Sequence, residues 1–237
     1  MTQTGRLGVV ALDAADIEGL ASFYTRLTGW VRESAEPDWI TILAPDGQRI
    51  AFQLAPDHVS PDWPGQERPQ QLHLDLLIDG HDAAAERAVG LGATRLAAGA
   101  TWITLADPAG HPFDICQRDG VGPVMGLFGV TLDAPDASAL ARFYADLLGM
   151  EVTYEGAEGA MVAGDGRSLM FQQVSQYNAP RWPDPAHPQQ AHLDIAVDDL
   201  DSGETRALAL GASRLEGGGE SFRVFADPAG HPFCLVA

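Results

Sequence analysis

Two short stretches of the chain each place a histidine two residues before an aspartate. They contain His73 with Asp75 and His192 with Asp194. Residues two apart in a strand share one face, so each imidazole would lie beside a carboxylate. Such a pair suits general acid–base chemistry, and the carboxylate could also orient a metal-ligating histidine. We treat these four residues as candidate catalytic residues; the alternative is a pocket or core histidine bonded to its neighbouring carboxylate.

The two stretches belong to an internal repeat that covers most of the chain. The sequence at 70–75 returns in altered form at 189–194, and the sequence at 107–113 returns unchanged at 227–233. The two offsets, 119 and 120 positions, are nearly equal. Equivalent positions of the two copies can therefore be compared. A side chain that differs between them indicates whether a proposed reaction or binding site requires that residue type.

Length and repeat together predict two domains. The 237 residues, of which 46% are hydrophobic and 20% charged, suit two soluble domains of roughly 100–150 residues each. We expect domains at 1–118 and 125–237, joined by a linker at 119–124. The chain has no apolar run near the roughly 18 residues of a membrane span and no signal pattern at its N-terminus. We therefore expect a cytoplasmic monomer or homodimer with no membrane partner.

Charge and cysteine content narrow the possible functions. The formal net charge is −19 and the chain has no lysine, so nucleic-acid binding, which needs clustered basic residues, is not expected. Cys116 and Cys234 are expected to be buried free thiols rather than a disulfide. Apolar surroundings raise the pKa of a thiol, which argues against a nucleophilic role for either cysteine.

Hydrophobic periodicity divides each repeat into two similar units. In the first unit a strand precedes a helix that is capped by Asp16 and ended by Gly29, and three short strands follow. The expected helices are 16–28, 82–91, 136–148 and 201–210. The expected strands are 7–13, 30–34, 38–44, 48–54, 71–78, 94–97, 101–106, 112–117, 127–133, 150–154, 160–163, 168–174, 190–197, 213–216, 221–226 and 232–236. The chain is therefore predicted to contain four βαβββ units.

This series of elements resembles the vicinal oxygen chelate superfamily, which includes glyoxalase I, extradiol dioxygenases and bleomycin-resistance proteins. The matching features are the aspartate-capped helix with Phe-Tyr and a final glycine, the histidine-led strand, the Leu-Gly-Ala helix end and the Asp-Pro-x-Gly turn, each present twice. The resemblance implies an α+β fold in which four βαβββ units form two glyoxalase-like cupped sheets with helices outside. It also implies metal ligands on the first and fourth strands of each unit.

The family's ligand positions can be placed on this sequence. Copy by copy, they fall on Val9, Gln53, His73 and Asp114, and on Gly129, Gln172, His192 and Cys234. The first-strand residues offer no ligand atom, and the glutamines are weak ligands. Because a catalytic metal usually has three protein ligands, no metal and no other cofactor is expected. If a divalent metal does bind, the resemblance implies His73, Asp114 and Gln53 as its ligands.

Two tryptophans are further candidates for ligand binding. Trp63 and Trp182 lie in proline-rich segments at 55–70 and 174–189 and are expected near the mouth of the cup. Aromatic side chains there could stack on a ligand, or they could cover a sheet edge. The expected ligand-binding set is Gln53, Trp63, His73, Asp114, Gln172, Trp182, His192 and Cys234.

Other repeated residues are expected to be structural. His111 and His231 come just before the last strand of each repeat, where a turn-stabilising role is expected. Trp102, which is matched by Phe222 in the second copy, is expected in the core.

Three functions fit these residues. We expect a glyoxalase-like protein that binds a small organic molecule in its cup without the family's full metal set, in a sequestering or carrier role. The alternative is a divalent-metal-dependent lyase, isomerase or dioxygenase that uses His73 and Asp114. A third is a metal-free acid–base enzyme built on His73 and Asp75. Acidic walls and the lack of lysine favour a neutral or cationic, partly aromatic ligand over a dianion.

Overall fold

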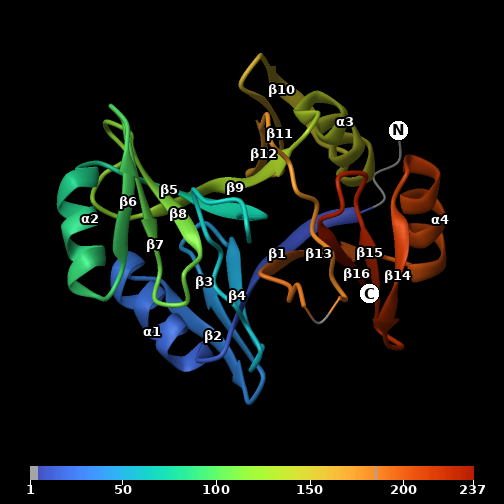
Figure 1. Cartoon of the computed structure of the whole chain (residues 1–237), viewed down its shortest axis with the longest axis horizontal. Coiled ribbons are helices and arrows are strands. Elements are labelled where there is room, and N and C mark those ends of the chain that lie inside the picture. Colours follow the sequence, from blue (N-terminus) through green and yellow to red (C-terminus); the bar gives the residue numbers. More distant parts are fainter. Residues whose placement is uncertain (1–4, 185) are drawn as a thin grey trace. The chain divides into compact units, whose positions relative to one another are not determined.

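The structure, a computed structural model, describes residues 5–184 and 186–237, which form four helices and sixteen strands (Figure 1). The first repeat contains β1 (Gly5–Ala14), α1 (Ile17–Thr28), β2 (Val31–Glu36), β3 (Trp39–Leu43), β4 (Arg49–Leu54), β5 (Leu72–Ile78), α2 (His81–Gly90), β6 (Thr94–Ala98), β7 (Trp102–Ala106) and β8 (Pro112–Gln117). The second repeat contains β9 (Gly126–Ala134), α3 (Ala137–Leu148), β10 (Glu151–Glu155), β11 (Gly159–Gly164), β12 (Arg167–Gln173), β13 (Ala191–Val197), α4 (Leu200–Leu210), β14 (Ser213–Gly218), β15 (Phe222–Ala226) and β16 (Pro232–Val236).

The strands form two eight-stranded mixed sheets. Their orders are β14-β15-β16-β13-β1-β4-β3-β2 and β10-β11-β12-β9-β5-β8-β7-β6. Each sheet therefore contains one βαβββ unit of each repeat. The predicted α+β fold with four βαβββ units is confirmed. The contacts of the chain group into two compact units, residues 11–130 and residues 1–10 with 131–237.

The helix α1 begins and ends where the sequence predicts. The side chain of Asp16 accepts a hydrogen bond from the backbone N–H of Gly19 at 2.9 Å, and Gly29 ends the helix with a φ of 79°. Glycine adopts this left-handed conformation without a steric penalty. The apolar face of α1 packs on β3 and β4. The helix α3 has the matching caps, Asp136 and Gly149, and packs on β11 and β12.

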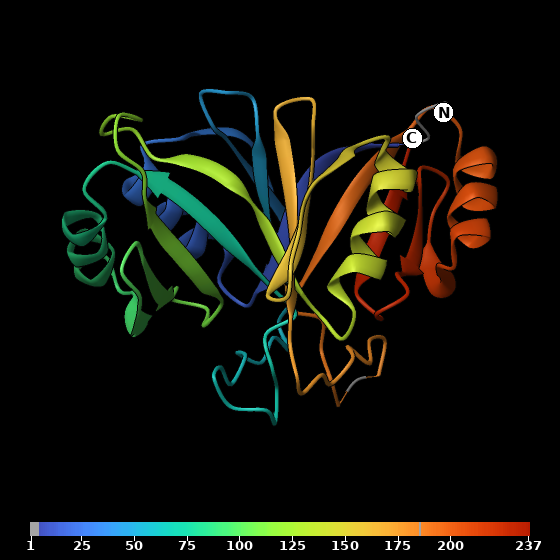
Figure 2. The same ribbon diagram turned by 90° about the horizontal axis from the view of Figure 1, so that it is seen from above.

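The other two helices each cover strands of their own unit. Helix α2 packs on β5, β7 and β8, and α4 packs on β14, β15 and β16, as Figure 2 shows for α4. Long loops follow β4 and β12 and lead into β5 and β13; their described residues are 55–71, 174–184 and 186–190 (Figure 2). No helix among the described residues is long and apolar enough to cross a membrane.

A buried carboxylate, that of Asp107, organises the turn that leads into β8. Its Oδ1 accepts hydrogen bonds from the backbone N–H groups of Ala109 and His111 at 2.9 and 3.0 Å. Its Oδ2 accepts the hydroxyl of Tyr24 at 3.0 Å and lies 3.2 Å from Nδ1 of His111. The carboxylate therefore connects α1 to the start of the last strand of the repeat.

The second repeat builds the same turn around Asp227. Its Oδ2 accepts the hydroxyl of Tyr144 at 3.0 Å and lies 3.0 Å from Nδ1 of His231, and both side chains of the Asp227–His231 pair are almost fully buried. His111 and His231 thus contact the carboxylate that organises their turn, and their stabilising role stays a prediction.

The prediction that Trp102 belongs to the core is wrong. Trp102 is 44% exposed, and its counterpart Phe222 is 38% exposed. Adjacent residues of a strand point to opposite faces. In β7 the side chains of Ile103 and Leu105 therefore face the core, and that of Trp102 faces away from it. The ring of Trp102 lies over Gly99, where an added Cβ would overlap it. The aromatic side chain thus covers backbone at the tip of a hairpin.

We expect Tyr24→Phe to destabilise the protein by roughly 1.5–3 kcal/mol, because it removes a hydrogen bond to a buried carboxylate. Tyr144→Phe should cost a similar amount, since its contact with Asp227 has the same length. Urea unfolding of both variants measures these free energies. A loss below about 0.5 kcal/mol in either would contradict a stabilising role for the hydroxyl.

The same tyrosines predict an alkaline limit on stability. Burial, followed by the neighbouring aspartate, raises the pKa of both Tyr24 and Tyr144 above its ordinary value. A raised pKa in the folded state gives stability that is present below about pH 10 and is lost as pH rises above it. The free energy of unfolding should therefore fall above about pH 10 more steeply in the native chain than in the double variant Tyr24→Phe, Tyr144→Phe.

Candidate functional site

The first cluster of polar side chains lies where β5 and β8 run side by side. The two strands pair in parallel, and the register places Asp75 opposite Asp114. His73 lies two residues before Asp75 and so faces the same side of the sheet. The structure therefore brings together His73 and Asp75, which the alternation of the strand places on one face, and Asp114, which the family resemblance places with His73.

Two buried polar atoms of this cluster lack a hydrogen-bond partner among the described residues. The side chain of His73 is only 9% exposed, and its Nε2 lies 3.7 Å from Oδ2 of Asp75, beyond a good hydrogen bond. Nδ1 of His73 and Oδ1 of Asp114 are buried and have no hydrogen-bond partner among residues 5–184 and 186–237. Buried atoms of this kind cost roughly 1–3 kcal/mol each unless a bound group satisfies them.

Cys116 is a neighbour of the cluster that the sequence analysis did not place there. Its thiol donates to Oδ1 of Asp75 at 3.8 Å. It is half-buried, whereas both cysteines were expected to be buried. Burial, then the charges of Asp75 and Asp114, raise the pKa of the thiol far above its usual range. The thiol therefore remains protonated at neutral pH, which does not suit a nucleophile. The sequence carried one sign of this contact. Cys116 comes two residues after Asp114 in a strand, so both side chains lie on the same face.

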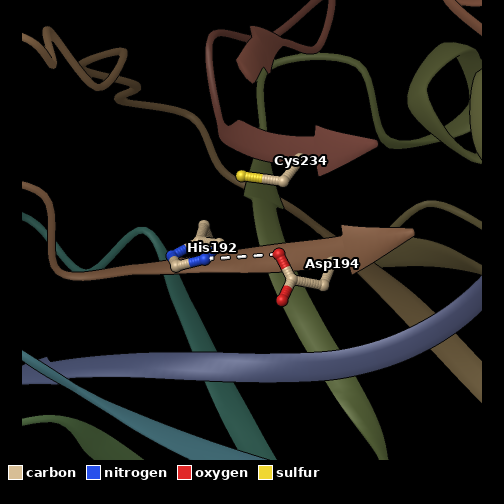
Figure 3. A group of neighbouring side chains, drawn as sticks. All are labelled: His192, Asp194 and Cys234. Atoms are coloured by element: carbon tan, nitrogen blue, oxygen red, sulfur yellow. Dashed lines mark ion pairs between the residues drawn. The ribbon is translucent and has the colours of Figure 1, made fainter. Parts of the chain in front are cut away.

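The second cluster lies at the matching place on β13 and β16. These strands also pair in parallel, and Asp194 is opposite Cys234. Nε2 of His192 lies 3.4 Å from Oδ1 of Asp194. Figure 3 shows the sulfur of Cys234 on the same side of the strands as the imidazole and the carboxylate. Cys234 holds the position that Asp114 has in the first repeat. The second cluster therefore has a sulfur atom in place of a carboxylate, in the same arrangement of strands.

A second residue that the sequence analysis missed holds the ring of His192. The side-chain amide nitrogen of Gln189 lies 2.9 Å from Nδ1 of His192. The sequence carries a glutamine three residues before the histidine in both copies, Gln70 and Gln189, which could have indicated this contact. The amide fixes the plane of the ring, so Nε2 is directed to Asp194.

Both clusters have a donor set that fits a divalent metal ion. Within each, one atom from each of three residues lies within 4.8 Å of the other two. The first cluster offers one imidazole nitrogen and two carboxylates, and the second offers one imidazole nitrogen, one carboxylate and one sulfur. Three protein donors is the number that catalytic zinc sites use. When bound, such an ion would supply Lewis acidity to a ligand oxygen.

The remaining predicted residues lie on other elements. Gln53 lies on β4, where its Oε1 is buried and without a hydrogen-bond partner in the part of the chain that the structure describes. Gln172 is exposed on β12. Trp63 and Trp182 are half-buried in the loops at 55–71 and 174–190, each before a cis proline bond. Their part in ligand binding stays a prediction, and so does that of the two glutamines.

A separate pocket of about 470 Å³ lies on the unit of residues 11–130. Its lining includes Asp16, Phe23 and Arg26 of the α1 region, together with His58 and Pro108. None of the predicted site residues lines it. The ring of His58 contacts that of His111, and its Nε2 lies 3.0 Å from the backbone carbonyl of Ala109.

Comparison with solved structures finds the same fold in distant proteins. Glyoxalase I from Zea mays is 16% identical with a TM-score of 0.62, over 99% of this chain and 92% of that one. A candidate dioxygenase from Bacillus subtilis is 13% identical with a TM-score of 0.62, over 100% and 86% of the two chains. The cppA protein from Streptococcus pneumoniae TIGR4 is 13% identical with a TM-score of 0.55, over 99% and 98%. These likenesses show the fold alone.

The sequence itself matches one family in both repeats. No curated protein matches the chain. The family described as glyoxalase-like domain matches residues 9–116 and again residues 129–236, which together make up most of the chain. Both matched segments span the histidine-led strand and end within the strand that pairs with it. The chain therefore belongs to the glyoxalase-like domain family of the vicinal oxygen chelate superfamily and carries the domain twice in tandem.

Proposed function

We propose that the chain binds a small organic molecule at the cluster of His73, Asp75 and Asp114, in a sequestering or carrier role. The observation that carries this proposal is the pair of buried, unpartnered atoms, Nδ1 of His73 and Oδ1 of Asp114, which occur together in one cluster of the described residues. A buried polar atom without a partner in the chain needs a bound group, such as a water molecule, an ion or a ligand, to satisfy it. A ligand that offers hydrogen-bond donors would satisfy the carboxylate.

The charge of the cluster favours a neutral or cationic ligand. Two carboxylates, those of Asp75 and Asp114, lie on neighbouring strands at the same register. The formal net charge of the chain is −19 and it has no lysine, so an anionic ligand would meet repulsion. A planar, partly aromatic compound with an amine or amide group suits such a cluster better than a phosphate or a dicarboxylate.

A metal-dependent lyase, isomerase or dioxygenase is the second candidate. The observation in its favour is the mutual distance of the three donor atoms, which lie within 4.8 Å. In this case His73 and Asp114 would hold the ion with Asp75, whereas the sequence comparison implied Gln53 as the third ligand. The protein residues would orient a substrate at the ion and keep its reacting oxygens away from bulk water.

The ligand proposal predicts that planar cationic or neutral aromatic compounds quench the tryptophan fluorescence of the native chain in a saturable titration. His73→Ala should weaken this binding at least tenfold, about 1.4 kcal/mol, because it removes the buried imidazole. His81→Ala, a half-buried histidine at the start of α2, is the matched control and should leave binding unchanged. Tight binding of phosphorylated or dicarboxylate compounds, together with unchanged binding in His73→Ala and Trp63→Ala, would show that the site is wrongly placed.

The charge argument makes a further prediction. Asp114→Asn keeps the shape of the side chain but removes its charge. It should weaken the binding of a cationic compound several-fold more than that of its neutral analogue, which calorimetry can measure for both. Equal losses for the two compounds would mean that the carboxylate does not interact with the charge of the ligand.

Elemental analysis of the protein purified without chelators separates the two candidate functions. The variant Cys234→Ser is used, so that the thiol of the second cluster does not contribute. We expect no metal content that depends on the first cluster. If near-stoichiometric metal is present and is lost in both His73→Ala and Asp114→Asn, the metal-dependent enzyme is the better account.

A further inference from the structure

We propose that the pocket beside α1 is a second ligand-binding site, which takes a short aliphatic hydroxy acid. The volume of the pocket, about 470 Å³, falls within the roughly 300–1,000 Å³ of small-molecule sites. The pocket lies wholly on the unit of residues 11–130 and shares no residue with the cluster of His73, Asp75 and Asp114. The proposal therefore goes beyond the function proposed for that cluster and does not depend on it.

Arg26 gives the pocket a positive charge. It lies in the last turn of α1 and lines the pocket with an exposed side chain. Its guanidinium forms no ion pair or hydrogen bond with the residues that the structure describes. A guanidinium binds a carboxylate through two parallel hydrogen bonds, which gives both affinity and orientation. We therefore assign the carboxylate of the ligand to Arg26.

The acidity of the chain does not exclude an anion at this place. Exposed charges more than about 8 Å apart are largely screened at physiological ionic strength, so the nearest charges decide. The carboxylate that lines the pocket, that of Asp16, precedes Arg26 by ten residues, about 15 Å along a helix axis. It also caps α1 by accepting the backbone N–H of Gly19 at 2.9 Å. The two charges of the pocket therefore lie far apart, and Arg26 can bind an anion.

His58 supplies a hydrogen-bond acceptor. Its Nε2 lies 3.0 Å from the backbone carbonyl oxygen of Ala109, which can only accept, so Nε2 carries the proton. Burial, followed by the charge of His111, lowers the pKa of His58, so the ring is neutral at neutral pH. Its Nδ1 is then an acceptor, and it is buried without a hydrogen-bond partner among the described residues. A ligand hydroxyl would satisfy Nδ1 after a small turn of the half-buried ring.

The wall that carries His58 is held in place by the chain itself. The hydroxyl of Ser60 donates to the same carbonyl of Ala109 at 2.9 Å. Gly110 lies so close to this segment that an added Cβ would stand 2.5 Å from Cβ of Ser60. Because the wall needs little ordering when a ligand binds, less of the binding free energy is lost.

The remaining wall of the pocket is apolar. Leu91, half-buried at the end of α2, and Pro108, exposed in the turn before β8, both line it. A short methylene chain would remove their surface and its own from water. The ligand class follows from the three parts of the pocket: a carboxylate for Arg26, a hydroxyl for His58 and an aliphatic chain between them.

The second repeat has the same wall without these polar groups. Tyr177 takes the place of His58, and its hydroxyl donates to the carbonyl of Ala229 at 2.7 Å. Asp146 takes the place of Arg26, which reverses the charge. The groups that would bind a hydroxy acid are therefore particular to the first repeat. The second repeat also shows that a tyrosine fits in the place of this histidine.

The experiment is a calorimetric titration of the full chain with three matched compounds at neutral pH. They are ω-hydroxyhexanoate, hexanoate, which lacks the hydroxyl, and hexanol, which lacks the carboxylate. We expect ω-hydroxyhexanoate to bind at one equivalent and the other two to bind at least fivefold more weakly. Arg26→Gln should weaken ω-hydroxyhexanoate at least tenfold and leave hexanol unchanged. Arg181→Gln, an exposed arginine of the other unit, is the matched control and should change neither.

Two further variants locate the hydroxyl and separate the two proposed sites. His58→Tyr should abolish the difference in affinity between ω-hydroxyhexanoate and hexanoate, because the acceptor is lost. Its melting temperature should stay near that of the native chain, since Tyr177 occupies the matching place in the second repeat. His73→Ala, which alters the first cluster, should bind ω-hydroxyhexanoate as the native chain does.

The proposal is overturned if ω-hydroxyhexanoate shows no saturable binding to the native chain, or if Arg26→Gln binds it as tightly as the native chain. Binding that is lost in His73→Ala and kept in Arg26→Gln would place the compound at the first cluster and also overturn it. Backbone ¹H–¹⁵N spectra give a second measurement. The amides of α1 and of the turn at 107–111 should shift with ω-hydroxyhexanoate, and shifts confined to β5 would contradict the site.

Discussion

The parallel pairing of a histidine-led strand with the last strand of its repeat is the constraint on which both clusters depend. It places Asp75 opposite Asp114 and Asp194 opposite Cys234. A slip of one residue would turn either set of donors to the opposite face of the sheet. The buried aspartate before each last strand fixes the turn from which that strand begins, because it bonds the turn and, through a tyrosine hydroxyl, the first helix of the repeat.

Comparison of the two repeats separates the residues that build the turn, here called the frame, from the donor residues of the clusters. Both keep the aspartate, histidine and tyrosine that fix the turn, with contacts of nearly the same length. They differ in the third residue of the cluster, where Cys234 takes the place of Asp114, and in the partner of the histidine Nδ1. The frame is therefore the same in both repeats, while the donor atoms of the two clusters differ.

Most of the fold and part of the site could be predicted from the sequence. Caps such as Asp16 and Gly29 and the period of apolar residues are local signals, and the predicted helix lies where they put it. Alternation likewise placed His73 beside Asp75. The contacts of Cys116 and Gln189 depend on side-chain conformation and on the distance between strands, which spacing does not determine. The prediction that Trp102 is buried was wrong because an aromatic residue at the matching position, Phe222, shows that the two positions are equivalent but not that either is buried.

The central claim is that the cluster of His73, Asp75 and Asp114 holds a ligand within this frame. Side-chain ¹H–¹⁵N correlation spectra of the seven histidines, recorded as a planar cationic aromatic compound is added, test it most directly. The account predicts that the ring nitrogens of His73 shift in a saturable way, whereas those of the turn histidines His111 and His231 do not. Unchanged resonances of His73 at saturating compound, or equal shifts of the turn histidines, would contradict it.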